Sequence, residues 1–260
     1  MKIGRIHSQH GKEAFDEIKS EGLSFIEICC NNLNDMKSVI SDKEIIKENS
    51  IRTGVAVSSV GRWNHTVNLG HSLDEEELSY YFALIDVAAE LGAHTFVAGI
   101  NKNPDVSLYK NYTRAIEFFD RLVRYANGRI KVAVQNCDWN NFVVSPAEWE
   151  VVLGEVEDLY IKYDPSHSYN RGDDYLAEMS EWGERIAHFH LKGTTHAGKR
   201  SVDDPPAGMD DIKWGSVFAV LHSRGYDGDL SIEPHSKTWK GEKGKGGILF
   251  TKSYIEKFVI

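Results

Sequence analysis

The stretch LYIKYDPSH, residues 159–167, joins a short run of alternating apolar residues to a polar turn at Asp164. The same change occurs twice more, where HFHLKG passes through His190 and LSIEPH reaches Glu233. Carboxylates and imidazoles are metal ligands, and each of these side chains stands where a predicted β-strand ends. Because parallel strands of a barrel end on one face, the three side chains are predicted to lie together there.

Around these stretches, β-rich runs alternate with longer amphipathic ones along the chain. Strands are predicted at residues 3–7, 24–29, 52–57, 94–100, 130–136, 159–164, 187–192 and 229–234. Helices are predicted at residues 11–21, 34–48, 74–91, 107–126, 146–154, 173–184, 214–224 and 247–258. Eight strand–helix units in 260 residues predict an α/β fold, a single (β/α)8 barrel domain over residues 1–260. A doubly wound sheet is the alternative, but no glycine-rich dinucleotide loop follows the first strand.

Alternation within the predicted strands assigns a direction to each polar side chain. In SFIEIC, residues 24–29, the isoleucines share one face and Glu27 lies on the other. In a barrel the aliphatic face meets the helices and the other face lines the interior. Gln135 points inward by the same rule, as do Lys162 and His188 one or two steps below the strand ends. Because a buried lysine is tolerated only when it is paired, Glu27 and Lys162 are predicted to interact.

Charge, hydropathy and cysteine usage exclude several classes of protein. The net charge of -9 argues against a nucleic-acid surface, which needs basic patches, and favours a small neutral substrate. No apolar run is long enough to span a membrane, and the N-terminal stretch becomes polar too early for a secretory signal. Three cysteines without a CxxC pair favour reduced thiols, so a cytoplasmic location is expected.

Six pieces of the sequence carry a family resemblance that spans nearly the whole chain. They are GLSFIEI, ELGAHTFV, YDPSHS, HFHLKG, PPAGMDDIKW and GYDGDLSIEPH. With these pieces the chain resembles the xylose isomerase-like TIM-barrel superfamily, and within it the sugar phosphate isomerase/epimerase group that includes the ketose 3-epimerases. Such families hold a divalent metal with Glu, Asp, His and Glu from strands five to eight. The resemblance therefore implies Asp164, His190 and Glu233 as ligands, and it places Gln135 where the first glutamate belongs.

Gln135 departs from the family's pattern. Family epimerases use both glutamates as acid and base on the two faces of the substrate carbon, beside a metal that stabilises an enediolate. A glutamine neither takes nor gives a proton at working pH, although its carbonyl oxygen can coordinate a metal. Glu233 remains as a base beside a metal-polarised carbonyl. Carboxylate, imidazole and amide ligands favour Mn, with Mg, Co, Zn and Fe as alternatives.

Several further residues near the predicted strand ends are candidates for the site. His167 and Lys192 are candidate catalytic groups, because each lies within three residues of a predicted ligand. The resemblance also implies a substrate contact for His167 and a sugar-binding loop for Arg200. The loops at 58–73 and 193–213 are candidates to close over the site. Other candidates for contact with the sugar are Asn136, Trp139, His7 and His65.

These residues support more than one function. The leading hypothesis is a metal-dependent isomerase or epimerase that abstracts a proton next to the carbonyl of a sugar or keto-sugar. A metal-dependent lyase is the alternative, because β-elimination on a 3-keto-glycoside needs one base and one acid. A third hypothesis is a catalytically weakened barrel subunit. The net charge disfavours a DNA repair endonuclease of the same fold superfamily. The resemblance also implies a homo-oligomer, either a dimer or a tetramer.

Overall fold

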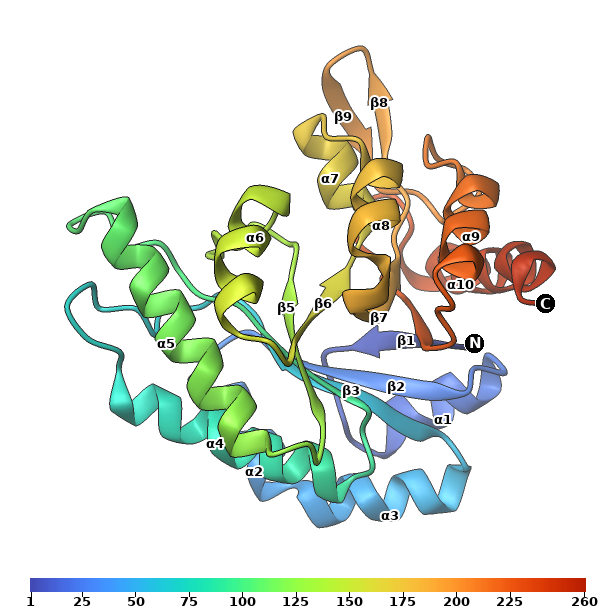
Figure 1. The fold of residues 1–260 in the computed structure, drawn as a ribbon. Helices are drawn as coiled ribbons and strands as arrows, with labels where there is room; N and C mark the ends of the chain where they lie inside the picture. Colours follow the sequence, from blue (N-terminus) through green and yellow to red (C-terminus); the bar gives the residue numbers. More distant parts are fainter.

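Eight parallel strands close into a barrel in the computed structural model, which describes all residues 1–260 (Figure 1). The barrel strands are β1 (Lys2–His7), β2 (Phe25–Cys30), β3 (Ala56–Arg62), β4 (Thr95–Ala98), β5 (Lys131–Gln135), β6 (Leu159–Tyr163), β7 (Ile186–Leu191) and β10 (Asp229–Ile232). Sequential barrel strands pair side by side, and β10 closes the ring against β1. The predicted (β/α)8 barrel is therefore confirmed.

Helices lie on the outside of this barrel and connect its strands. They are α1 (Lys12–Ser20), α2 (Leu33–Ser41), α3 (Lys43–Thr53), α4 (Glu75–Glu90), α5 (Leu108–Ala126), α6 (Pro146–Glu155), α7 (Pro165–Arg171), α8 (Tyr175–Trp182), α9 (Trp214–Ser223) and α10 (Gly241–Ile255). Two short 3-10 turns, η1 (Gly183–Arg185) and η2 (Glu256–Phe258), complete the helical segments. None of the helices combines the length and the apolar character that a membrane span requires.

Local sequence explains how these elements begin and which face they bury. Helix α6 begins with a capping box, in which the backbone nitrogen and hydroxyl of Ser145 both donate to the Glu148 carboxylate. In β2, Ile26 and Ile28 are buried in the hydrophobic core. Glu27 between them is also fully buried, on the barrel side of the strand. The alternation read from the sequence therefore assigns the interior face correctly in this strand.

The structure differs from prediction in the region before β3. The predicted helix 34–48 is two helices, α2 and α3, with a break at Asp42, whose backbone has φ -93° and ψ 9°. Helix α3 continues through Thr53 and ends at Gly54, which adopts a left-handed φ of 76°. The third strand consequently occupies residues 56–62 rather than the predicted 52–57.

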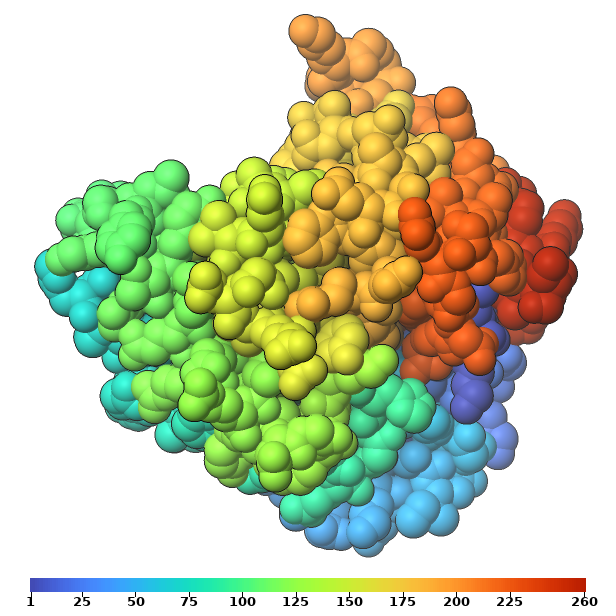
Figure 2. Space-filling view, viewed as in Figure 1, coloured from blue at the N-terminus to red at the C-terminus, as the bar shows by residue number.

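Three segments that carried no predicted structure are ordered elements. Helix α7 begins directly after β6, because Asp164 caps it and Pro165 occupies its first turn. The glycine-rich segment 241–247, whose composition predicts a loop, forms the first half of α10. The loop at 193–213 carries an antiparallel hairpin of β8 (Thr195–Ala197) and β9 (Arg200–Asp203). Figures 1 and 2 show this hairpin projecting beyond the body of the barrel.

Candidate active site

Three hydrogen-bonded side chains lie in the barrel interior below the strand ends. We call Glu27, His188 and His190 the lower layer; all three are buried. Glu27 Oε2 accepts hydrogen bonds from His188 Nε2 at 2.9 Å and from His190 Nε2 at 2.8 Å. The predicted pair of Glu27 with Lys162 is wrong, because the two histidines from β7 take the carboxylate instead.

In the lower layer, the Glu27 carboxylate and the His190 imidazole each stabilise the charged form of the other. Burial would raise the pKa of Glu27, but the two histidines outweigh burial and hold this pKa well below its usual range. Burial likewise disfavours the charged form of His190, yet the Glu27 carboxylate outweighs it and raises the pKa of the imidazole. His190 Nδ1 lies 3.0 Å from Glu233 Oε2. His190 thus connects the lower layer to the strand ends.

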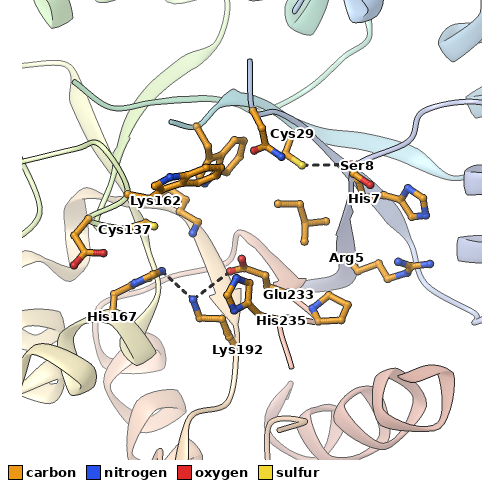
Figure 3. Close-up of a pocket in the computed structure, with 16 residues that line it drawn as sticks. Arg5, His7, Ser8, Cys29, Cys137, Lys162, His167, Lys192, Glu233 and His235 are labelled. Carbon is orange, nitrogen blue, oxygen red and sulfur yellow. Dashed lines mark hydrogen bonds and ion pairs between the residues drawn. The ribbon is translucent and has the colours of Figure 1, made fainter. Parts of the chain in front are cut away.

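A second group of ionisable side chains lies at the carboxyl ends of the strands, where all of them except the buried Asp164 line a cavity of about 550 Å³. We call Asp164, His167, Lys192 and Glu233 the mouth cluster. Lys192 Nζ lies 3.4 Å from Asp164 Oδ2, 3.7 Å from Glu233 Oε2 and 2.9 Å from His167 Nε2. Figure 3 shows Lys192 between His167 and Glu233. Four residues from three different strand ends therefore converge at one point.

The mouth cluster combines two carboxylates, an ammonium group and a neutral imidazole. Burial opposes ionisation of Asp164, but Lys192, His167 and Lys162 lower its pKa to about 2. Burial also opposes ionisation of Glu233, but Lys192 and His190 hold its pKa well below the usual range. Burial and the nearby Lys192 charge lower the pKa of His167 to about 3. Glu233 is thus a carboxylate at neutral pH, which is the form that a general base needs.

Lys192 keeps its proton in this setting. Burial disfavours an ammonium group, but the Asp164 and Glu233 carboxylates outweigh burial and raise the pKa of Lys192. Its ammonium donates a hydrogen bond to the neutral ring of His167 at Nε2. The cluster therefore holds a proton donor close to the Glu233 base.

Gln135 ends β5 with its side chain fully buried. Its Nε2 lies 2.9 Å from His65 Nε2, whereas its Oε1 has no hydrogen-bond partner. The next residue, Asn136, acts on the backbone: its Nδ2 donates to Asp164 O and its Oδ1 accepts from Asp164 N, both at 2.9 Å. Asn136 therefore fixes the strand end that carries Asp164.

The structure brings some of the predicted substrate-binding residues to the cavity and leaves others away from it. Trp139 lines the cavity and is 48% exposed. His7 also lines it, although its Nδ1 bonds the backbone of Gln9. Asn136 and His65 are fully buried outside the cavity lining, and Arg200 is exposed on β9 in the projecting hairpin. Trp139 and His7 are thus the better placed for contact with a ligand.

The cavity is also lined by residues that the sequence reasoning did not assign to the site. Arg5, Cys29 and Cys137 are among them. The inward position of Cys29, two residues after Glu27, is a signal that could have found it. Burial raises the pKa of Cys29 to about 12 and also raises that of Cys137. Neither thiol is therefore an activated nucleophile.

The residues at the strand ends fit a divalent cation. The buried Gln135 Oε1 has no hydrogen-bond partner, and Asp164 Oδ2 has none beyond its ion pair with Lys192 at 3.4 Å, so both oxygens could coordinate a cation. His190 is oriented by the Glu27 carboxylate, as outer carboxylates orient metal-binding histidines. Ligand atoms of Asp164, His167 and Glu233 lie within 4.8 Å of one another. Because Lys192 contacts the same carboxylates, an entering cation would compete with its ammonium group.

Comparison with known proteins places this site in a family context. A family model described as xylose isomerase-like TIM barrel matches residues 15–254. A comparison with curated proteins found no sequence match. Solved structures with the same fold include sugar epimerases. One is D-psicose 3-epimerase in the presence of D-fructose, with a TM-score of 0.80 and 16% identity over 100% of this chain and 99% of that chain.

Two further solved structures align over nearly the full length of both chains. The 3-keto-D-glucoside 4-epimerase from E. coli has a TM-score of 0.77 and 16% identity, covering 99% of each chain. D-Psicose 3-epimerase with D-tagatose from Clostridium cellulolyticum H10 has a TM-score of 0.77 and 13% identity, covering 100% of this chain and 99% of that chain. At these identities the likeness shows the shared fold.

Proposed function

The chain belongs to the xylose isomerase-like TIM barrel family, and from this premise we propose a metal-dependent isomerase or epimerase that acts on a sugar or keto-sugar. The observation that carries the proposal is the Glu233 carboxylate, which follows β10, lines the cavity and contacts the Lys192 ammonium group. The fold shared with sugar epimerases supports a sugar as the substrate class.

In the proposed reaction, Glu233 removes a proton from the carbon next to the substrate carbonyl. Its depressed pKa keeps it ionised at neutral pH, and its position in the cavity gives it access to a bound sugar. The Lys192 ammonium group, which donates a hydrogen bond to the neutral His167 ring, stabilises or protonates the oxygen on which negative charge develops. If Glu233 returns the proton to the neighbouring carbon, and Lys192 protonates the carbonyl oxygen and takes the proton of the adjacent hydroxyl, the result is isomerisation. If Lys192 protonates the opposite face of the same carbon, the result is epimerisation.

The proposed metal ligands are Asp164, His190, Glu233 and Gln135 through its Oε1. Such a set of oxygen and imidazole groups suits Mn, with Mg, Co, Zn and Fe as alternatives. A bound divalent ion would polarise the substrate carbonyl and so acidify the adjacent C–H bond. Trp139 and His7, which line the cavity, are proposed to contact the sugar.

A lyase is the second candidate, because Gln135, which ends β5 where the family's pattern has a glutamate, cannot serve as a second base. In β-elimination on a 3-keto-glycoside, Glu233 would take the proton next to the ketone. The electrons of that C–H bond would form a C=C bond as the glycosidic C–O bond breaks. The leaving oxygen would take its proton from Lys192. This reaction needs one base and one acid, which the mouth cluster supplies.

Hydrogen exchange tests these alternatives directly. Wild type and the Glu233→Gln variant would be incubated with Mn²⁺ and a panel of ketoses and 3-keto-glucosides in D2O, and the products followed by NMR. An isomerase or epimerase incorporates deuterium next to the carbonyl and forms a new sugar, whereas a lyase releases the leaving alcohol. The exposed Glu242→Gln variant is the matched control. Absence of exchange with every compound would contradict the proposal and favour a catalytically weakened barrel subunit.

A further inference from the structure

Gln135 is linked through His65 to Tyr81 by a chain of hydrogen bonds between buried side chains. Gln135 Nε2 lies 2.9 Å from His65 Nε2, and His65 Nδ1 lies 3.0 Å from the Tyr81 hydroxyl. These three side chains are fully buried, and none of them lines the cavity. They come from the end of β5, the segment after β3, and α4. The contacts form one continuous chain that ends at the site.

The direction of each hydrogen bond in this chain follows from its chemistry. The amide nitrogen of Gln135 only donates, so His65 Nε2 accepts. A ring nitrogen that accepts a hydrogen bond carries no proton, so the His65 ring is neutral and its single N–H is on the other nitrogen. That proton is on Nδ1 and is donated to the Tyr81 oxygen.

The His65 ring has little room to turn. A Cβ atom placed on Gly99 would lie only 2.5 Å from His65 Nε2, so the ring packs directly against this glycine backbone. The Gln135 backbone is held as well, because its carbonyl accepts a hydrogen bond from Asn141 Nδ2 at 2.7 Å. Both ends of the His65–Gln135 contact are therefore fixed by their surroundings.

We propose that Tyr81 and His65 are positioning residues that decide which end of the Gln135 amide faces the site. They bind its NH2 group and leave Oε1, which has no other partner, as an acceptor for the ligand at the strand ends. The reverse orientation would take this acceptor away from the site and leave the NH2 group there instead. The inference rests on the proposed function in treating Gln135 as part of that site.

The Tyr81→Phe variant tests this inference, because it removes the acceptor of the His65 Nδ1 proton without touching the cavity. The proton then moves to Nε2, and the Gln135 amide must turn its oxygen toward His65. The affinity of chelator-treated protein for Mn²⁺, measured by calorimetry, should fall by about 10- to 100-fold, as for other residues that orient metal ligands. The matched control is Tyr226→Phe, which removes a buried hydroxyl bonded to Asp229 O and should leave the affinity unchanged.

The same Tyr81→Phe substitution in a Gln135→Glu variant distinguishes an effect on the orientation of the Gln135 amide from a general effect on the structure. A carboxylate has two equivalent oxygens, so the Gln135→Glu variant has no amide orientation to lose. Adding Tyr81→Phe to Gln135→Glu should change Mn²⁺ affinity less than about twofold. An equal loss in both backgrounds, or no loss in wild type, would overturn the inference.

Histidine NMR provides a readout that does not depend on metal binding. Long-range ¹H–¹⁵N spectra should show His65 as the Nδ1–H tautomer in wild type and as the Nε2–H tautomer in Tyr81→Phe. An Nε2–H tautomer in wild type would overturn the inference even in a protein that binds no metal. Absence of Mn²⁺ and sugar binding with the expected tautomers would contradict the proposed function alone.

Discussion

The lower layer and the mouth cluster are built from similar side chains but differ in what those side chains can reach. In the lower layer, Glu27 is fully buried, and its carboxylate pairs with His188 and His190. In the mouth cluster, Glu233 is met by Lys192 yet still lines a cavity of about 550 Å³. Access to the cavity, more than residue type, therefore separates a supporting carboxylate from one that can act on a substrate.

Substitution of Glu233, the carboxylate that lines the cavity, should change turnover the most. Glu233→Gln keeps the shape of the side chain but removes the base, so turnover should fall by about 10³-fold. The fall in turnover is measured from initial rates with the substrate that hydrogen exchange identifies, and Glu242→Gln is the control. Retention of more than a tenth of the wild-type rate would show that another group removes the proton.

A smaller effect is expected from the enclosed carboxylate. Glu27→Gln leaves the cavity unchanged but weakens the hold on His190, so Mn²⁺ affinity should fall by about 10- to 100-fold. Turnover at saturating Mn²⁺ should fall less than in Glu233→Gln. Calorimetry and initial rates check both values, and circular dichroism verifies the fold. A loss of turnover equal to that of Glu233→Gln would remove the distinction between the two groups.

Lys192 should have opposite effects on metal binding and on turnover. Its ammonium neutralises Asp164 and Glu233, so Lys192→Met should raise Mn²⁺ affinity by about tenfold, which corresponds to about 1.4 kcal/mol. Turnover should decrease, because the proton donor is lost. Calorimetry on chelator-treated protein measures the affinity, and the exposed Lys199→Met is the control. A lower affinity in Lys192→Met would mean that the lysine supports the metal site rather than competing with it.

The last prediction concerns stability and pH. Because the pKa of His167 is about 3 in the folded protein against 6.5 for the free side chain, the unfolded state binds its proton first as pH falls. Stability should therefore decrease from about pH 6.5 toward pH 4 in the presence of chelator. Urea unfolding at several pH values should show a shallower decrease in His167→Gln. An unchanged slope would show that His167 is more exposed or more easily protonated than its contacts indicate.

Local sequence rules were sufficient for the barrel and for the direction of its polar side chains. The period of two along a strand places Glu27 and Gln135 inside, and turn residues such as Pro165 mark the strand ends. The same rules gave the wrong third strand, because Ile51 to Thr53 suit either a strand or the last turn of α3.

Contacts between distant segments could not be read from the sequence. Glu27 and its partner His190 are 163 residues apart, and their pairing depends on the stagger of two strands, β2 and β7, that are not neighbours in the barrel. The contact between His65 and Gln135, 70 residues apart, depends equally on tertiary packing. The sequence therefore predicted that Asp164, His190 and Glu233 lie at neighbouring strand ends, but not the partners that set their charge and orientation.

Metal binding tests the central claim most directly, namely that the strand ends at the barrel mouth form a divalent cation site. Chelator-treated wild type and Asp164→Asn would be titrated with Mn²⁺ by calorimetry, and the bound metal measured after desalting. We expect a single bound ion per chain in wild type and a large loss of affinity in Asp164→Asn. Folded wild type that binds no Mn²⁺, Mg²⁺, Co²⁺, Zn²⁺ or Fe²⁺ would contradict it.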